Sequence, residues 1–286
     1  MERYYDLVII GAGPAGMSAA IYGSRAGLST LMLEMGAPGG KLIKTNEISN
    51  WPGIRSTSGA SLASEMFEHA TSFGAVYAYG EVVRIEDGEQ KQVICADGTA
   101  YTCKAVIVAT GTAERMLNIP GEEENVGRGV SYCALCDGPF FDGQDVAVAG
   151  GGNTAFEDAL FLAERCRSVT LIHRRKTFRA EQALVEQAAQ RKNLTILTDT
   201  VITDLHADNG ELEHLLLKNA DGRETRLPVS GLFVAFGRVP DTEMAAALAE
   251  RDQEGYLLTN DRMETAAPGF FAAGDCRHKQ VRQLTT

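Results

Sequence analysis

The chain has 286 residues, of which 44% are hydrophobic and 23% charged, so it is long enough for two domains and is neither disordered nor fibrous in character. Its formal net charge of −11 argues against nucleic acid or an anionic membrane surface as a standing partner, because both require a cationic surface. No apolar run approaches the roughly 20 residues that span a bilayer, and the start of the chain lacks a signal-peptide pattern, so we expect a cytoplasmic protein without membrane association.

The first motif is a glycine-rich loop between an expected strand over residues 6–10 and an expected helix over 17–26. In a dinucleotide-binding unit, the first glycine makes a tight turn, the second admits a pyrophosphate, and the third lets helix and strand pack closely. A second expected strand over 28–33 leads to Glu34, whose carboxylate can accept hydrogen bonds from adenosine ribose hydroxyls. The loop consists of Gly11, Ala12, Gly13, Pro14, Ala15 and Gly16.

Cys133 and Cys136 are separated by two residues and are followed by Asp137 and Gly138. Three interpretations remain open: half of a zinc site, two unreactive thiols, or a redox-active dithiol. Zinc prefers four ligands, and no second pair of this kind completes them. The spacing puts both sulfurs on one face of a turn, and a helix beginning there would favour the thiolate. Asp137 is placed either to move a proton or to form an ordinary turn with Gly138.

The remaining cysteines lie in apolar or strand-like surroundings and are expected to be buried or free thiols. They are Cys95, Cys103, Cys166 and Cys276. The acidic run over residues 122–124 is expected to be a solvated loop. No spacing of cysteines and histidines predicts a metal site.

A second glycine-rich loop follows an expected strand over residues 145–149 and precedes an expected helix over 156–163. Its own next strand, over 169–172, leads to His173. The first glycines of the two loops are 139 residues apart, and so are Glu34 and His173. Two strand–loop–helix–strand units in the same register predict two nucleotide-binding domains. The second loop consists of Gly150, Gly151, Gly152, Asn153, Thr154 and Ala155.

The two units differ in charge where the second strand ends. The first ends in a carboxylate, whereas His173 is followed by Arg174 and Arg175, with Arg179 one turn further on. A 2′-phosphate is repelled by a carboxylate and attracted by guanidinium groups. The first loop is therefore expected to hold an unphosphorylated adenosine and the second NADPH. The alternative is that these arginines form only a solvated basic face.

Taken together, the motifs resemble the low-molecular-weight, bacterial-type NADPH-dependent thioredoxin reductases, which are class II pyridine nucleotide-disulfide oxidoreductases. The resemblance covers essentially all 286 residues. Its most specific element is the cysteine pair just before the second loop, because related disulfide reductases carry their cysteines in the first domain. The resemblance rests on both loops and the cysteine pair with its Asp-Gly, on Ala109-Thr110-Gly111, on His173-Arg174-Arg175 with Phe178-Arg179-Ala180, and on Gly274-Asp275.

The family implies an α/β fold of two Rossmann-like, three-layer ββα domains, with the second inserted into the first. The FAD-binding domain would comprise residues 1–113 and 242–286, and the NADPH-binding domain 114–241. Implied FAD contacts are Gly11, Gly13, Pro14, Ala15, Gly16, Glu34, Gly40, Lys41, Leu42, Thr45, Asn50, Val83, Ala109, Thr110, Gly111, Gly274, Asp275, Arg282 and Gln283. Implied NADPH contacts are Gly151, Gly152, Asn153, Thr154, Glu157, His173, Arg174, Arg175, Arg179 and Gly237.

The implied reaction carries electrons from NADPH through FAD to the disulfide of Cys133 and Cys136, and then to thioredoxin. Cys136 would lie nearest the flavin, Asp137 would act as acid and base, and Cys133 would attack the disulfide of thioredoxin. Rotation of the NADPH domain on linkers near residues 112–115 and 237–241 would let both partners reach the flavin. Thioredoxin would dock near Arg128, Phe140 and Phe141, although the two phenylalanines can equally be core residues. A homodimer is a further family expectation.

This sequence departs from the family in two places. Lys41 stands where the family usually has Gln, and a cation there would raise the flavin potential. The family also continues beyond the position of Thr286 into a long helix, so we expect that helix to be truncated here or replaced by a partner. Three other functions remain open: a reductase of another small dithiol protein, a ferredoxin-dependent reductase of the same fold, and a non-catalytic nucleotide-binding protein.

Overall fold

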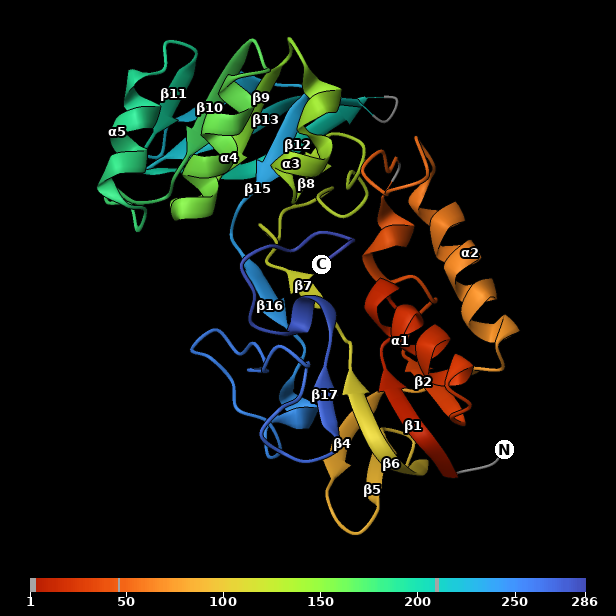
Figure 1. Ribbon diagram of the computed structural model, residues 1–286. Helices are drawn as coiled ribbons and strands as arrows, with labels where there is room; N and C mark the ends of the chain where they lie inside the picture. Colours follow the sequence, from red (N-terminus) through yellow and green to blue (C-terminus); the bar gives the residue numbers. More distant parts are fainter. Residues whose placement is uncertain (1–3, 46, 209–210) are drawn as a thin grey trace. The chain divides into compact units, whose positions relative to one another are not determined.

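The computed structural model describes residues 4–45, 47–208 and 211–286 (Figure 1). The chain forms two compact units, the first made of Met1–Ala113 with Val239–Thr286 and the second of Glu114–Arg238. It leaves the first unit in β7 (Thr112–Glu114) and returns in β16 (Arg238–Pro240), and these two strands pair in a two-stranded sheet. Within the described ranges, no helix has the length and apolar character needed to cross a bilayer.

The first unit is built on a seven-stranded sheet in the order β3-β2-β1-β6-β5-β4, with β17 beside β6. Strands β3, β2, β1, β6 and β17 run parallel. Strand β5 pairs antiparallel with the first half of β6, and β4 pairs antiparallel with β5. The strands are β1 (Tyr4–Ile10), β2 (Thr30–Glu34), β3 (Val76–Tyr79), β4 (Val82–Glu86), β5 (Lys91–Cys95), β6 (Ala100–Val108) and β17 (Phe270–Ala272). The helices are α1 (Pro14–Arg25) and α2 (Gly59–Ser72), with 3-10 turns η1 (Gly40–Lys44), η3 (Glu243–Ala245) and η4 (Gly274–Cys276).

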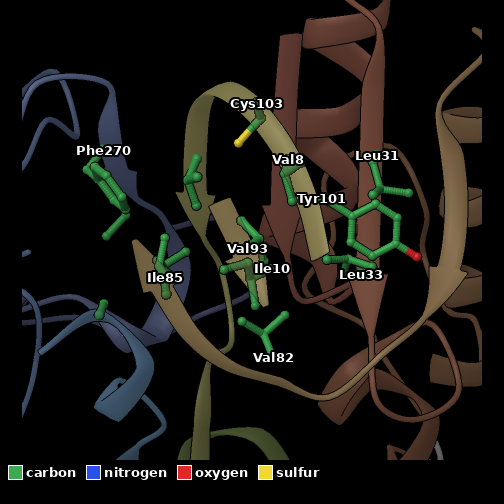
Figure 2. Close-up of a cluster of buried hydrophobic side chains, with 14 of the residues drawn as sticks. Val8, Ile10, Leu31, Leu33, Val82, Ile85, Val93, Tyr101, Cys103 and Phe270 are labelled. Carbon is green, nitrogen blue, oxygen red and sulfur yellow. The ribbon is translucent and has the colours of Figure 1, made fainter. Parts of the chain in front are cut away.

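Alternation of apolar side chains along β1 sets up the layers of this unit. Leu7 and Ile9 pack in one cluster with α1 and α2, whereas Val8 and Ile10 pack in another with β4 and β5. Successive side chains of a strand point to opposite faces, so a strand apolar at every position can be covered on both sides. Figure 2 shows the second cluster, in which Val8 and Ile10 lie among side chains of β2, β4, β5 and β6. Each such side chain contributes about 1.5–3 kcal/mol when buried.

The second unit repeats this plan. Its parallel sheet has the order β11-β10-β9-β15-β8, and a three-stranded antiparallel sheet, β12-β13-β14, covers one face. Val146 and Val148 of β9 pack with α4 and α5, while Ala147 and Ala149 pack with the antiparallel strands. The elements are β8 (Val130–Ser131), α3 (Ala134–Asp137), η2 (Gly138–Phe141), β9 (Asp145–Ala149), α4 (Asn153–Ala163), β10 (Ser168–Ile172), α5 (Gln182–Gln190), β11 (Leu194–Leu197), β12 (Thr200–Asp208), β13 (Glu211–Asn219), β14 (Glu224–Pro228) and β15 (Gly231–Val234).

The expected α/β architecture of two Rossmann-like units is therefore confirmed. Some element ends differ from expectation. Both loop helices begin three residues earlier than expected, at Pro14 and Asn153, inside the glycine loops. Proline suits the first helical turn because its missing N–H would have no partner there. Strand β2 starts at Thr30 instead of Leu28, because the Leu28 N–H bonds the Gly23 carbonyl and finishes α1.

Candidate active site

The cysteine pair lies at the start of a short helical turn in the second unit. Cys133 is the N-cap of α3, and its sulfur accepts the N–H of Cys136 at 3.3 Å. The two residues form a disulfide with a Cα–Cα distance of 5.3 Å. The expectation that the pair opens a helix and can form a disulfide is confirmed. Among the described residues, no group of three or more His, Cys, Asp and Glu side chains could hold a metal ion.

The two sulfurs differ in exposure. Cys136 is exposed, whereas Cys133, the residue that caps α3, is half-buried. The other four cysteines are buried and free, as expected from their apolar surroundings. Burial raises the pKa of the Cys103 and Cys166 thiols to about 11, so neither is a nucleophile at neutral pH.

Asp137 is the last residue of the short helix α3 that contains the second cysteine. Its N–H bonds the Cys133 carbonyl at 3.0 Å, and its Oδ2 accepts the hydroxyl proton of Ser131 at 2.6 Å. Burial raises the pKa of this carboxyl, and the hydrogen bond from Ser131 opposes that rise. A buried carboxyl whose pKa is raised by burial is suited to acid–base work beside a thiol. Sequence reasoning missed Ser131, since a serine two residues before a cysteine carries no distinctive signal.

Glu122 anchors the chain that leads into the cysteine pair. Its side chain is 1% exposed, so the expectation of a solvated loop over residues 122–124 is wrong at this position. Its carboxylate accepts the N–H groups of Leu117 and Asn118 at 2.9 and 2.8 Å and the hydroxyl of Tyr132 at 2.8 Å. These three charge-assisted bonds compensate for burial of the charge. Tyr132 immediately precedes Cys133, so Glu122 fixes the entry to the disulfide.

The first glycine loop has the shape that its sequence predicts. A Cβ on Gly11 (φ 104°) would overlap the carbonyl of Ala109, and one on Gly16 would overlap the carbonyl of Gly11. A Cβ on Gly13 would meet nothing nearer than the Gly40 Cα, 4.0 Å away. Gly13 is the N-cap of α1, and no side chain caps that helix. The first and third glycines are therefore required by packing, whereas the second leaves free space beside uncapped N–H groups, where an anion is favoured.

Three distant segments meet at this loop. The Glu34 carboxylate accepts the N–H of Ala12 at 2.9 Å, the Gly39 N–H bonds the Ala12 carbonyl at 2.8 Å, and a Cβ on Gly274 would lie 2.7 Å from that of Ala15. The loop thus contacts residues from the ends of β2 and β17 and from the start of η1. Since each carboxylate oxygen has two lone pairs, Glu34 is held in place and can still accept further hydrogen bonds.

Several other residues expected to contact FAD are tied to one another or to neighbouring segments of the first unit. Asn50 donates to the side chain of Gln283 at 3.2 Å, and the Thr110 hydroxyl donates to the Asp241 carbonyl at 2.5 Å. Arg282 stacks its guanidinium 4.1 Å from the Tyr256 ring centroid, and its buried Nε has no hydrogen-bond partner in the described parts of the chain. An orphaned buried donor suits an anionic, hydrogen-bonding ligand.

The remaining members of that set have varied surroundings. Lys41 donates to the hydroxyl of Thr112 at 2.7 Å, Thr45 donates to the Lys41 carbonyl at 3.2 Å, and Asp275 pairs with Lys279 at 2.9 Å. Leu42 is buried in the core beside α2. Val83, on β4, is half exposed. Ala109 and Gly111 lie where β6 ends beside the loop.

The second loop shares this geometry. A Cβ on Gly152, the N-cap of α4, would meet no atom within 4 Å, whereas one on Gly151 would overlap the ring of His173. The Gly151 carbonyl accepts the Arg179 N–H at 2.8 Å, and Asn153 makes two hydrogen bonds to Glu181. The segment after β10 is therefore tied to the loop, and the start of α4 has free space for an anion.

The arginines of this segment are exposed. Arg174, Arg175 and Arg179 make no ion pair with any residue in the described ranges. His173 contacts the carbonyl of Thr177 at 3.1 Å through Nε2. Thr154 and Glu157 lie exposed on the first turns of α4. In a chain of net charge −11, exposed guanidinium groups in a segment tied to the start of α4 have a charge suited to binding a phosphate.

The residues expected to receive a protein partner divide into two kinds. Phe140 is 47% exposed and Arg128 is exposed, whereas Phe141 packs edge-to-face on Phe233 at 5.4 Å and closes over Gly231. Phe141 is thus part of the core, as one of the two open interpretations had it. Gly237, also expected at the NADPH site, adopts φ 87° and accepts the Arg115 N–H at 3.1 Å in the connection beside β16.

Comparisons with known proteins agree with this geometry. The sequence profile of the pyridine nucleotide-disulphide oxidoreductases matches residues 5–286. The chain belongs to this family. A thioredoxin reductase from Bacillus subtilis (strain 168) is 43% identical over 286 residues, which cover all of this chain and 90% of the relative. The crystal structure of thioredoxin reductase from Streptococcus pyogenes MGAS5005 superimposes with a TM-score of 0.96 at 41% identity, covering all of this chain and 94% of that one.

A structure with lower sequence identity is also that of a thioredoxin reductase. Thioredoxin reductase from Giardia duodenalis gives a TM-score of 0.92 at 32% identity, covering 99% of this chain and 94% of that one. The resemblance inferred from the sequence motifs is therefore confirmed. Family membership also implies flavin and nicotinamide cofactors in general.

Proposed function

We propose that this chain is an NADPH-dependent thioredoxin-disulfide reductase. The observation that carries the proposal is the disulfide of Cys133 and Cys136 at the N-terminus of α3, with the buried Asp137 carboxyl in the same turn. The thioredoxin reductases to which the chain is similar support it across the full length.

The first unit, with the return after about residue 241, is proposed to bind FAD. Gly13 and Gly40 leave room for the pyrophosphate, Glu34 accepts from the adenosine ribose, and the orphaned Nε of Arg282 supplies a donor. Gly274 and Asp275 approach the loop from β17. The remaining contacts are those that the family resemblance implies. The proposed effect of Lys41 on the flavin potential stays a prediction.

The second unit is proposed to bind NADPH. Gly152 and the N–H groups at the start of α4 would hold the pyrophosphate, and Arg174, Arg175 and Arg179 the 2′-phosphate. When bound, the two cofactors supply hydride and electron-pair transfer to the disulfide. The linkers β7 and β16 are proposed to allow the rotation that the family uses.

The cysteines carry out thiol–disulfide exchange in two displacements. The Cys133 thiolate attacks the disulfide of thioredoxin, which forms a mixed disulfide and releases one thioredoxin thiolate. The Cys136 thiolate then attacks the Cys133 sulfur, which restores the intramolecular disulfide and releases the second thioredoxin sulfur. Asp137 passes a proton from the Cys136 thiol to a leaving thiolate.

The proposed docking surface for thioredoxin comprises the exposed Arg128 and Phe140, with Phe141 supporting Phe140 from the core. By resemblance to the family, we further propose that the protein is a homodimer and acts in the cytoplasm.

A coupled assay tests the proposal. The purified protein should be yellow, should be bleached by NADPH without oxygen, and should reduce thioredoxin with NADPH in preference to NADH. Replacing Arg174 and Arg175 together by alanine should remove that preference, with Arg191, which pairs with Glu164 elsewhere in the second unit, as the matched control. A colourless protein would lack the proposed flavin and would contradict the proposal. Reduction of a different small dithiol protein in place of thioredoxin would show that thioredoxin is not the partner.

A further inference from the structure

The hydroxyl of Ser131 joins the two ends of the cysteine turn. Ser131 is the last residue of β8 and is 4% exposed. Its oxygen accepts the N–H of Cys133 at 3.0 Å, and its proton goes to Oδ2 of Asp137 at 2.6 Å. One buried hydroxyl therefore fixes both the backbone of a redox cysteine and the carboxyl beside it.

The directions of these bonds assign different roles to the two oxygens of Asp137. A hydroxyl has a single proton, and two acceptors lie near that of Ser131: Oδ2 of Asp137 at 2.6 Å and the Cys133 carbonyl at 3.4 Å. The much shorter contact places the proton on the bond to Oδ2. Oδ2 is thereby engaged as an acceptor. Oδ1 makes no hydrogen bond to a described residue, so a proton held by Asp137 lies on Oδ1.

The same bond acts on the charge of the carboxyl. Burial raises the pKa of Asp137, and donation from Ser131 stabilises the ionised form and counters the rise. Without the hydroxyl, the carboxyl would keep its proton to a higher pH and release it less readily.

We propose that Ser131 is a positioning residue that holds the Asp137 carboxyl with Oδ1 free to exchange a proton with the cysteine pair. This inference rests on the proposed thiol–disulfide exchange. In that exchange, Oδ1 takes the proton of the Cys136 thiol as the thiolate forms. It gives the proton to the thiolate that leaves the partner, so one S–H bond breaks and another forms. Ser131 stabilises Asp137 while the carboxyl is ionised between these two transfers.

The test compares Ser131→Ala and Ser131→Thr with a matched control in the same unit. Ser168→Ala is that control, because the Ser168 hydroxyl donates to Oδ1 of Asp145 at 2.7 Å, away from the cysteines. The measurements, on the FAD-loaded enzyme, are the pH dependence of thioredoxin reduction and the pH dependence of iodoacetamide alkylation after reduction by NADPH. A loss of packing alone would change thermal stability without moving either pH profile.

We expect Ser131→Ala to move the pH transition carried by Asp137 upward, Ser131→Thr to restore it, and Ser168→Ala to leave it in place. Should the alanine variant not fold, Ser131→Gly removes the same hydroxyl and carries the same expectation. Asp137→Asn distinguishes the acid–base role of Asp137 from the positioning role of Ser131. If it leaves the transition intact, the acid–base role of Asp137 fails, and the role of Ser131 fails with it. If it abolishes the transition while loss of the Ser131 hydroxyl does not move it, only the role of Ser131 is overturned.

Discussion

The hydroxyl of Tyr132 donates a 2.8 Å hydrogen bond to the buried carboxylate of Glu122, ten positions earlier in the chain. Burial, together with this carboxylate, raises the pKa of Tyr132, which favours the protonated hydroxyl that donates this bond. The residue that follows Tyr132 is Cys133, and the bond therefore holds the entry to the redox pair.

Tyr132→Phe should lower the free energy of unfolding by about 1–3 kcal/mol, because Glu122 loses one of its three donors. Glu122→Gln should cost more, since an amide cannot accept at both oxygen positions and would set its NH₂ group against a donor. Thermal unfolding checks both. Glu123→Gln is the matched control, because Glu123 is the next residue and is exposed, and it should change the free energy of unfolding little. Equal effects at Glu122 and Glu123 would contradict the role of Glu122.

Gly13→Ala should leave the fold intact and abolish FAD binding. The new Cβ has room in the protein, 4.0 Å from its nearest neighbour, but it occupies the space proposed for the pyrophosphate. Gly16→Ala is the contrast, because its Cβ would overlap the Gly11 carbonyl and should destabilise the first unit itself. Flavin content and circular dichroism of both variants distinguish the two outcomes. A Gly13→Ala protein with a full complement of FAD would refute the proposed position of the pyrophosphate.

Asp158, on α4, should make the protein less stable as pH rises toward neutrality. Burial, and to a lesser degree the charge of Glu157, raises its pKa from 3.8 to about 7, while Arg238 opposes the rise. The folded state therefore holds a proton that the unfolded state has lost between these pH values. The contribution of Asp158 to the free energy of unfolding therefore falls by at most about 4 kcal/mol between pH 3.8 and about 7, and is constant above that range.

Asp158→Asn should remove this dependence, so that the variant gains stability over the parent as pH rises from 4 to 7. Thermal midpoints of both proteins at a series of pH values measure the difference. Asp221→Asn serves as the control, because that side chain is exposed in the turn between β13 and β14. A constant gap between the Asp158 variant and the parent across the range would count against the prediction.

Phe140→Ala and Phe141→Ala should have opposite signatures. Phe140 is 47% exposed, so its loss should raise KM for thioredoxin with little change in stability. Phe141 is half-buried and packs on Phe233, so its truncation should cost about 3 kcal/mol of stability through the cavity it leaves. Steady-state kinetics with varied thioredoxin and thermal unfolding separate them. An unchanged KM in the Phe140 variant would remove that residue from the docking surface.

The sequence by itself determined the two nucleotide-loop units, their common register and the spacing of the cysteine pair. These depend on residues close together in the chain. Glycines between a strand and a helix define their own local geometry, whereas the cysteine spacing left a zinc site, free thiols and a redox dithiol open until the structure paired the two sulfurs. The family resemblance followed from the same local motifs and was confirmed.

Only the tertiary structure decided which residues surround those motifs. The burial of Glu122 depends on donors from Leu117, Asn118 and Tyr132, and Phe141 became a core residue through its contact with Phe233, far along the chain. The link from Ser131 to Asp137 likewise forms only when β8 turns into α3. The hydrogen-bond partners of Glu122 and Ser131 lie within ten positions in the chain, but their residue types carry no distinctive signal, and the burial that makes these bonds important depends on how the segments pack.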